Sequence, residues 1–171
     1  MHNALRFVGL IGLLGLGSLL AGCGKSGSHQ KASSPSDTRG VIVSASDCTA
    51  FGEDAVKACS GAIERAVASH EASSAQYNNV EACKKVVGAN GCERSAAGTY
   101  RARLSAFMVT IGKGSASAEP LYPVKGGGVG FQTASASKLM ANDQSVVFSR
   151  LATSVAESQA SASGKKGKKV F

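Results

Sequence analysis

The sequence is poor in large aromatic side chains. It has no tryptophan, and aromatic residues make up 5% of its 171 residues. Because aromatic side chains supply much of the area that a protein core buries, a large and densely packed core is not expected. The length fits one modest domain with tails.

The chain also lacks the groupings of side chains that most enzymes use. Among its three histidines, His29 lies in a polar segment, and His70 lies near the apolar face at the end of an expected helix. A structural or solvated role is expected for His70. No serine stands in a nucleophile elbow, and no carboxylate pair stands out, since Glu53 and Asp54 are explained by the start of a helix. The sequence therefore predicts no enzymatic activity, no catalytic residue and no cofactor.

No hydrophobic run is long enough to cross a bilayer. The longest, from Phe7 to Leu20, follows Arg6 and falls short of the roughly 20 residues that a spanning helix needs. It has the length of a signal-peptide core and is followed by small residues. An uncleaved anchor or a buried helix is the alternative, but glycines interrupt the run and no stop-transfer pattern follows it. We therefore expect residues 1–22 to be a signal peptide.

The end of this run, Leu20-Ala21-Gly22-Cys23, resembles a bacterial lipobox. The resemblance implies cleavage before Cys23 and lipidation of Cys23, which would attach the protein to a membrane through several acyl chains. Gly24 stands where inner-membrane lipoproteins typically carry Asp. The expected location is therefore the bacterial cell envelope, with the outer membrane, facing the periplasm, favoured over the inner membrane.

Polar segments flank the part of the chain that can fold. Residues 23–40 are rich in Ser and Gly and are expected to form a flexible tether. Residues 159–171 are expected to form a disordered basic tail, in which four lysines gather: Lys165, Lys166, Lys168 and Lys169. The net charge is +8, so these lysines carry much of it and could contact an anionic envelope polymer. A solvated tail is the simpler interpretation, and export makes nucleic acid an unexpected partner.

Four cysteines remain once Cys23 is assigned to lipid: Cys48, Cys59, Cys83 and Cys92. An even number in an exported chain predicts two disulfides. A weak internal repeat of the cysteine segments favours the local pairs, 48 with 59 and 83 with 92. Pairing between the two expected helices, 59 with 83 and 48 with 92, stays open. Free thiols that act in redox chemistry or metal handling are an alternative, although the spacing is wider than Cys-X-X-Cys and closely spaced Cys/His pairs are missing.

The apolar pattern predicts an α+β fold for residues 41–158, with a cysteine-framework part (41–98) and a hairpin-and-helix part (99–158). A strand is expected at 41–43, a helix from 54 to about 70, and a second helix that Asn79 caps and Gly88 ends. Residues 100–111 fit either a strand buried on both faces or a short helix. A glycine-turn hairpin is expected at 121–133.

A last helix is expected after Asp143 as its N-cap. Its apolar stripe would be Val147, Leu151 and Val155. The predicted fold is thus a small disulfide-stapled domain with two to three short helices and a small antiparallel sheet, flanked by flexible tails.

Several motifs together resemble the YgiB-like bacterial lipoproteins, a family catalogued as a domain of unknown function. They are the lipobox and tether, Ser46-Asp47-Cys48, Cys59 within a helix, Glu81-Ala82-Cys83, Gly91-Cys92, Pro120-Leu121-Tyr122 and Phe131-Gln132-Thr133-Ala134. The resemblance covers roughly residues 20–135. It implies an envelope location and a cysteine framework, but no activity and no catalytic residue.

The function expected from the sequence is that of a non-enzymatic envelope lipoprotein, acting as a structural or accessory interaction protein in the periplasm. Its expected partners are the membrane, through the lipid, and an envelope protein or an anionic polymer. The alternatives are a thiol-redox or metal-handling protein that uses the four cysteines and an electrostatic binder of anionic envelope polymer.

Overall fold

The computed structural model describes residues 37–164 of the chain. In chain order, the elements are β1 (Thr38–Ile42), η1 (Ala45–Phe51), η2 (Glu53–Ala55), α1 (Val56–Ser73), α2 (Val80–Val87), β2 (Cys92–Arg94), β3 (Tyr100–Ala102), β4 (Ala106–Gly112), β5 (Ser115–Pro123), β6 (Gly130–Gln132), β7 (Lys138–Met140), β8 (Val147–Phe148) and α3 (Arg150–Gly164). The predicted signal peptide and nearly all of the predicted tether lie outside the described residues, as do residues 165–171.

The first two helices form where the pattern predicts them. α1 buries one face, on which Cys59, Ile63, Ala66 and His70 follow one another at steps of three and four residues. α2 begins after Asn79, whose side-chain oxygen accepts a hydrogen bond from the backbone N–H of Ala82 at 2.8 Å.

α2 ends at Gly88, whose φ of 101° lies in the region that favours glycine. Both ends of this short helix are therefore encoded locally.

Residues 100–111, expected to form one strand or a short helix, divide between two strands: β3 belongs to the two-stranded sheet, and β4 lies inside a six-stranded sheet. The strand order is β7-β6-β5-β4-β1-β8, so β4 is paired on both sides. β4 pairs antiparallel with β1, with Met108 opposite Val41. A tight turn connects β4 to β5, which also pairs with it antiparallel, with Gly112 opposite Ser115. Ala106 to Val109 are all buried, which agrees with a strand covered on both faces.

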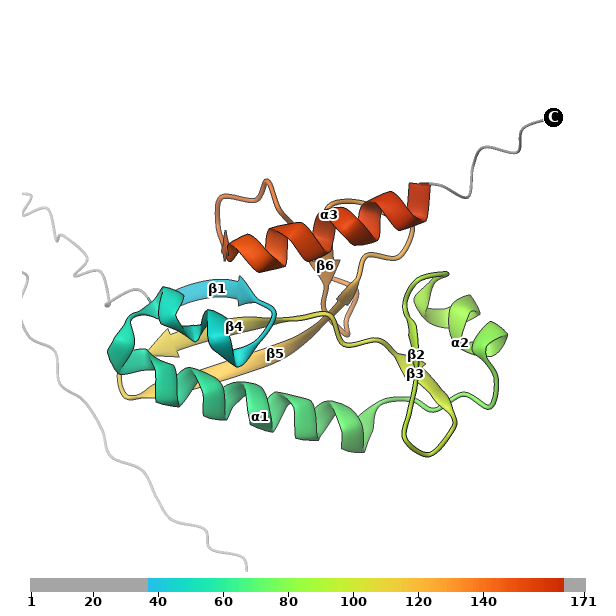
Figure 1. Cartoon of the computed structure of the whole chain (residues 1–171), viewed down its shortest axis with the longest axis horizontal. Helices are drawn as coiled ribbons and strands as arrows, with labels where there is room; N and C mark the ends of the chain where they lie inside the picture. The colour runs from blue at the N-terminus through green and yellow to red at the C-terminus, as the bar shows by residue number, and fades with distance from the viewer. Residues whose placement is uncertain (1–36, 165–171) are drawn as a thin grey trace, which may run out of the picture. The chain divides into compact units, whose positions relative to one another are not determined.

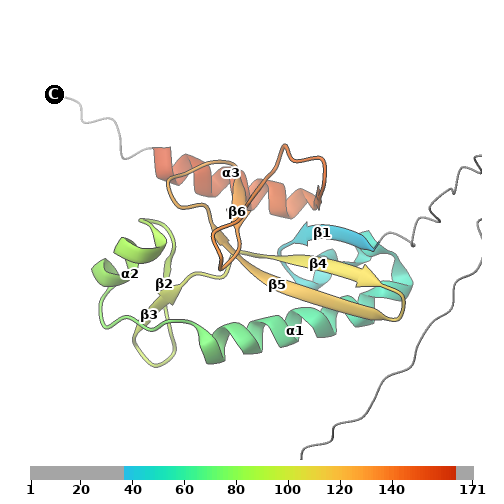
Figure 2. The same ribbon diagram turned by 180° about the vertical axis from the view of Figure 1, so that it is seen from behind.

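The two faces of the sheet carry two apolar clusters, and a helix covers each face (Figure 1). Phe107 and Val109 point to the α1 side and pack with Ile42, Ile63 and the Cys48–Cys59 region. The α3 side holds Val41, Ala106, Met108, Leu121, Phe131, Val146, Ala152 and Ala156. Figure 2 shows the same order from behind, with α3 and α1 on opposite sides of the strands. The short helix α2 and the two-stranded sheet β2–β3 lie at one end of the domain formed by residues 37–164 (Figures 1 and 2).

The predicted α+β class and the presence of disulfides are confirmed. The sheet is larger than expected, and it is not purely antiparallel, because β8 pairs parallel with β1. Since β1 and β8 come from opposite ends of the domain, no local sequence signal predicts this pair.

The predicted start of the last helix is wrong. Asp143 does not cap it; its carboxylate accepts a hydrogen bond from the backbone N–H of Ser145 in a turn. The cap is Ser149, whose side-chain oxygen accepts from the backbone N–H of Ala152 at 3.0 Å. Residues 147 and 148 are held in β8 by pairing with β1, so the helix can begin only after them.

The predicted apolar stripe of this helix is also wrong in part. Val147 is 73% exposed and Leu151 is 44% exposed, whereas Ala152 and Ala156 are fully buried. Val155 packs only at the margin of the cluster. Alanine faces the sheet because its small side chain lets the helix backbone approach the strands closely.

The edges of the folded region differ from the expected boundaries. β1 begins at Thr38, so residues 38–40 belong to the sheet rather than to the tether. α3 continues to Gly164, so residues 159–164 are helical rather than part of the tail. Within residues 37–164, no helix combines the length and the apolarity that a bilayer crossing requires.

Candidate functional site

Both disulfides join cysteines that are close in sequence. Cys48 of η1 is bonded to Cys59 of α1, with the two Cα atoms 5.8 Å apart. Cys83 of α2 is bonded to Cys92 of β2, with the Cα atoms 6.1 Å apart. These are the local pairs, not the pairs between the two helices.

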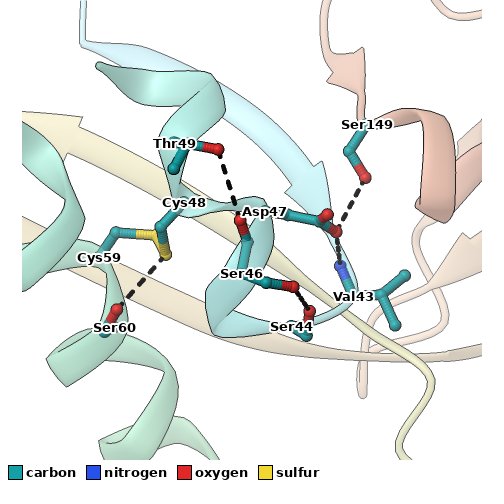
Figure 3. The surroundings of a disulfide bond; sticks show 9 residues. All are labelled: Val43, Ser44, Ser46, Asp47, Cys48, Thr49, Cys59, Ser60 and Ser149. Atoms are coloured by element: carbon teal, nitrogen blue, oxygen red, sulfur yellow. Dashed lines mark hydrogen bonds between the residues drawn. A yellow bond between two sulfur atoms is a disulfide. The ribbon is translucent and has the colours of Figure 1, made fainter. Parts of the chain in front are cut away.

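The segment around Cys48 is also tied to both ends of the domain by Asp47. One carboxylate oxygen of Asp47 accepts from the backbone N–H of Val43 at 3.0 Å and from the hydroxyl of Ser149 at 3.1 Å (Figure 3). Ser60 of α1 donates to the sulfur of Cys48 at 3.9 Å. The first disulfide therefore lies in a bonded junction between η1, α1 and the cap of α3.

The thiol-based alternative requires accessible thiols. Cys48, Cys59 and Cys83 have no exposed surface, and all four cysteines of this region are paired. Among residues 37–164, no group of three or more His, Cys, Asp and Glu side chains is placed to hold a metal ion. Reactive cysteines are partly exposed thiolates, whereas these four cysteines are bonded in disulfides.

The remaining site residues of the sequence prediction lie outside the described residues. They are the lipidation site Cys23 and the basic cluster Lys165, Lys166, Lys168 and Lys169. Their roles stay predictions.

The structure adds a cavity of about 620 Å³ that the sequence did not predict. It lies between the end of α1, α2 and the part of the sheet formed by the end of β5 and the β6–β7 turn. The residues that line it are Ser73, Ser74, Ala75, Tyr77, Val86, Val87, Gly91, Ala102, Tyr122, Pro123, Lys125, Gln132, Thr133, Ala134, Ala136 and Lys138. This volume is in the range of ligand-binding clefts.

A buried histidine stands behind one wall of this cavity. His70 is only 3% exposed. Its Nδ1 lies 2.8 Å from the hydroxyl of Ser74 and 3.0 Å from the hydroxyl of Tyr122, and both of these residues line the cavity. The Ser74 hydroxyl donates to the backbone carbonyl of His70, which fixes the end of α1.

Charged side chains surround the other side of the ring. Nε2 of His70 lies 3.9 Å from a carboxylate oxygen of Glu93, and Arg101 donates to that same oxygen at 2.8 Å. Arg101 also lies 3.6 Å from Glu71 of α1. This network ties the β2–β3 hairpin to α1.

The surroundings of His70 favour its neutral form. Burial lowers the pKa of His70, and the positive charge of Arg101 lowers it further, whereas Glu93, Glu71 and a hydrogen bond to the backbone of Ala102 raise it. Burial also raises the pKa of Tyr122, with Glu119 and Glu93 adding to the effect. The Tyr122 hydroxyl therefore stays protonated and can donate a hydrogen bond.

The sequence carried part of the signal for this network. The sequence places His70 near the apolar face of the helix, because it follows the other buried residues of α1 at helical spacing. Its partners Tyr122 and Glu93 come from distant strands, and only the tertiary structure brings them to it.

A model of a protein family, described as "Protein of unknown function (DUF1190)", matches residues 36–170. No curated protein and no solved structure matches the chain significantly.

Proposed function

The chain belongs to the DUF1190 family, which is the YgiB-like family of the resemblance, and we propose that it is a non-enzymatic lipoprotein of the bacterial cell envelope. In this proposal, acyl chains on Cys23 anchor it to a membrane, preferably the outer one, and the domain faces the periplasm. There it acts as an accessory interaction protein, with its cavity as the binding site.

The observation that carries this proposal is the pairing of all four cysteines of the domain in two disulfides, with Cys48, Cys59 and Cys83 fully buried. Disulfides of this kind persist in oxidising spaces such as the periplasm. Together with the signal segment and the lipobox-like sequence, they support a domain that is exported and then held at a membrane.

The polar network supports a binding role over a catalytic one. Ser74 and His70 are close enough for a nucleophile and its base, but the Ser74 proton is directed to a backbone carbonyl. Glu93, which would have to orient the ring, is 3.9 Å away and bonds more closely to Arg101. The geometry supports a satisfied network that shapes a cavity wall.

Two measurements on protein from envelopes test the proposal. Mass spectrometry after thiol blocking without reductant should find Cys48, Cys59, Cys83 and Cys92 unblocked and linked in the two local pairs. Metabolic labelling with a fatty-acid analogue should label the protein, and Cys23→Ser should abolish both the label and membrane retention.

Either of two results would contradict it. Alkylation of one pair as free thiols would favour the thiol-based alternative for that pair. Labelling that survives in the Cys23→Ser variant would remove the proposed anchor.

A further inference from the structure

The charged side chains that line the cavity are all positive. Two lysines, Lys125 and Lys138, line it, and within the described part of the chain no aspartate or glutamate does. The Lys125 ammonium group donates to the backbone carbonyl of Val86 at 2.9 Å, which holds it at the wall formed by α2. Lys138 lies on the edge strand β7 and is exposed. An anionic group in this cavity would meet positive charge without an opposing carboxylate.

A hydroxyl donor, Tyr122, lies on another part of the wall. Tyr122 and Ser74 line the cavity, and the ring of His70 backs both hydroxyls from inside the protein. Hydrogen bonds from neutral donors to a charged acceptor are stronger than those between neutral groups. The Tyr122 hydroxyl is therefore suited to a carboxylate, whereas the Ser74 hydroxyl already donates to the backbone carbonyl of His70.

The remaining wall is apolar. Val86 is 54% exposed although it is a large aliphatic residue, and Val87 and Pro123 continue the surface. An apolar group placed here would cover a side chain that otherwise faces water.

We propose that this cavity binds a small amphiphilic carboxylate, with the acid group at Tyr122 and Lys138, which lie in one row across β5, β6 and β7, and the apolar body against Val86. The inference rests on the proposed binding role of the cavity and adds the chemical class of its ligand. The carboxylate can belong to a free organic acid or to the C-terminus of a peptide.

Binding of this kind couples to protonation of His70. Without ligand, the neutral Nδ1 can accept a hydrogen bond from the Tyr122 hydroxyl. A carboxylate that accepts the Tyr122 hydrogen bond leaves Nδ1 facing the oxygens of Tyr122 and Ser74 without a donor, which favours the imidazolium form. The other groups around the ring are Arg101, which opposes this charge, and Glu93 and Glu71, which support it. Binding should therefore raise the pKa of His70 and take up a proton.

Calorimetric titration of the full-length lipidated protein, in a nonionic detergent at about pH 6.5, tests the proposal. The probe is 3-phenylpropionate, and its neutral amide is the matched control. The acid should bind measurably more tightly than the amide. Repeating the titration in two buffers of different ionisation enthalpy should reveal proton uptake, and His70→Gln should abolish the uptake while the acid still binds.

Three variants locate the site. Tyr122→Phe should weaken binding of the acid about tenfold, as expected for a lost hydrogen bond to a charged group. Lys138→Gln, at an exposed position that does not disturb the core, should weaken it about twofold to fivefold. Lys113→Gln, in the β4–β5 turn and outside the cavity lining, should leave it unchanged.

A second pair of probes distinguishes the two sources of the carboxylate. A tripeptide with a free C-terminus and the same tripeptide as its C-terminal amide are titrated in the same way. Tighter binding of the free-ended peptide than of phenylpropionate assigns the site to peptide C-termini, and the reverse order assigns it to small acids.

The proposal is overturned if acids and amides bind equally, if neither acid binds at millimolar concentration, or if Lys113→Gln weakens binding as much as Lys138→Gln. None of these results affects the disulfide and lipid measurements, so the envelope assignment and the ligand class can fail separately.

Discussion

Replacing the Cys48–Cys59 disulfide by two alanines should destabilise the whole domain. The bond closes a loop with a sequence separation of 11. In the chain-entropy model, a loop of this length contributes about 2.8 kcal/mol to the free energy of unfolding. Both sulfurs are fully buried in the cluster with Ile42 and Phe107, so their removal adds a packing loss of about 1 kcal/mol. The expected total is about 4 kcal/mol, against a typical domain stability of about 5–15 kcal/mol.

The second disulfide provides the matched comparison. Cys83–Cys92 has a sequence separation of 9, for which the same model gives about 2.6 kcal/mol. It belongs to neither apolar cluster of the main sheet, and the helix that it holds, α2, packs on β2 and β3. Cys83→Ala with Cys92→Ala should therefore loosen α2 and the β2–β3 hairpin locally and leave the six-stranded sheet folded.

The assay is urea unfolding followed by circular dichroism, combined with amide hydrogen exchange under oxidising conditions. The first double variant should lower the unfolding midpoint and speed exchange throughout the sheet. The second should speed exchange mainly in residues 80–102. The reasoning is refuted if the first variant loses less than about 1 kcal/mol, or if the second unfolds the sheet as readily as the first.

Three further predictions concern other parts of the chain. Because burial holds the pKa of His70 below its ordinary value of 6.5 in the folded protein, the unfolded chain binds more protons, and the stability of the domain should fall as the pH drops below about 6.5. His70→Gln should flatten this pH dependence in thermal melts at several pH values, and an unchanged slope would contradict the prediction. Gly130→Ala should lower the free energy of unfolding in urea by about 2 kcal/mol or more, because its Cβ would overlap the carbonyl oxygen of Leu139 and approach Cα of Met140 to 2.9 Å. A variant as stable as the parent would show that β6 and β7 can separate freely. Deleting residues 165–171 should abolish retention on an anionic envelope polymer at low salt if the lysines bind it; unchanged retention would show that the tail does not contribute.

Local features of the fold followed from the sequence. The start of α2 at Asn79 and its end at Gly88 depend on residues within one turn of the helix. The disulfides join cysteines separated by 11 and 9 positions, so their pairing also depends on a short stretch of chain. For residues 100–111 the sequence leaves a strand and a short helix open, because apolar residues fall on both parities, and the structure divides the segment between β3 and β4.

The last helix shows where local patterns mislead. Val147 and Leu151 have the spacing of an apolar helix face, but residues 147 and 148 pair with β1 and so belong to the sheet. The buried face then consists of Ala152 and Ala156, whose low hydrophobicity gives a weak sequence signal. Which residues of α3 are buried depends on how the helix packs against strands that come from elsewhere in the chain.

The candidate site depended on the tertiary structure to a still greater degree. The sequence by itself determined the first two helices and favoured the local cysteine pairs, since each depends on neighbouring residues. The burial of His70 against Tyr122 and Glu93, the parallel pairing of β1 with β8 and the cavity beside α2 were decided only by the tertiary structure. They join groups far apart in the chain, and the free energy that selects them comes from packing the whole domain.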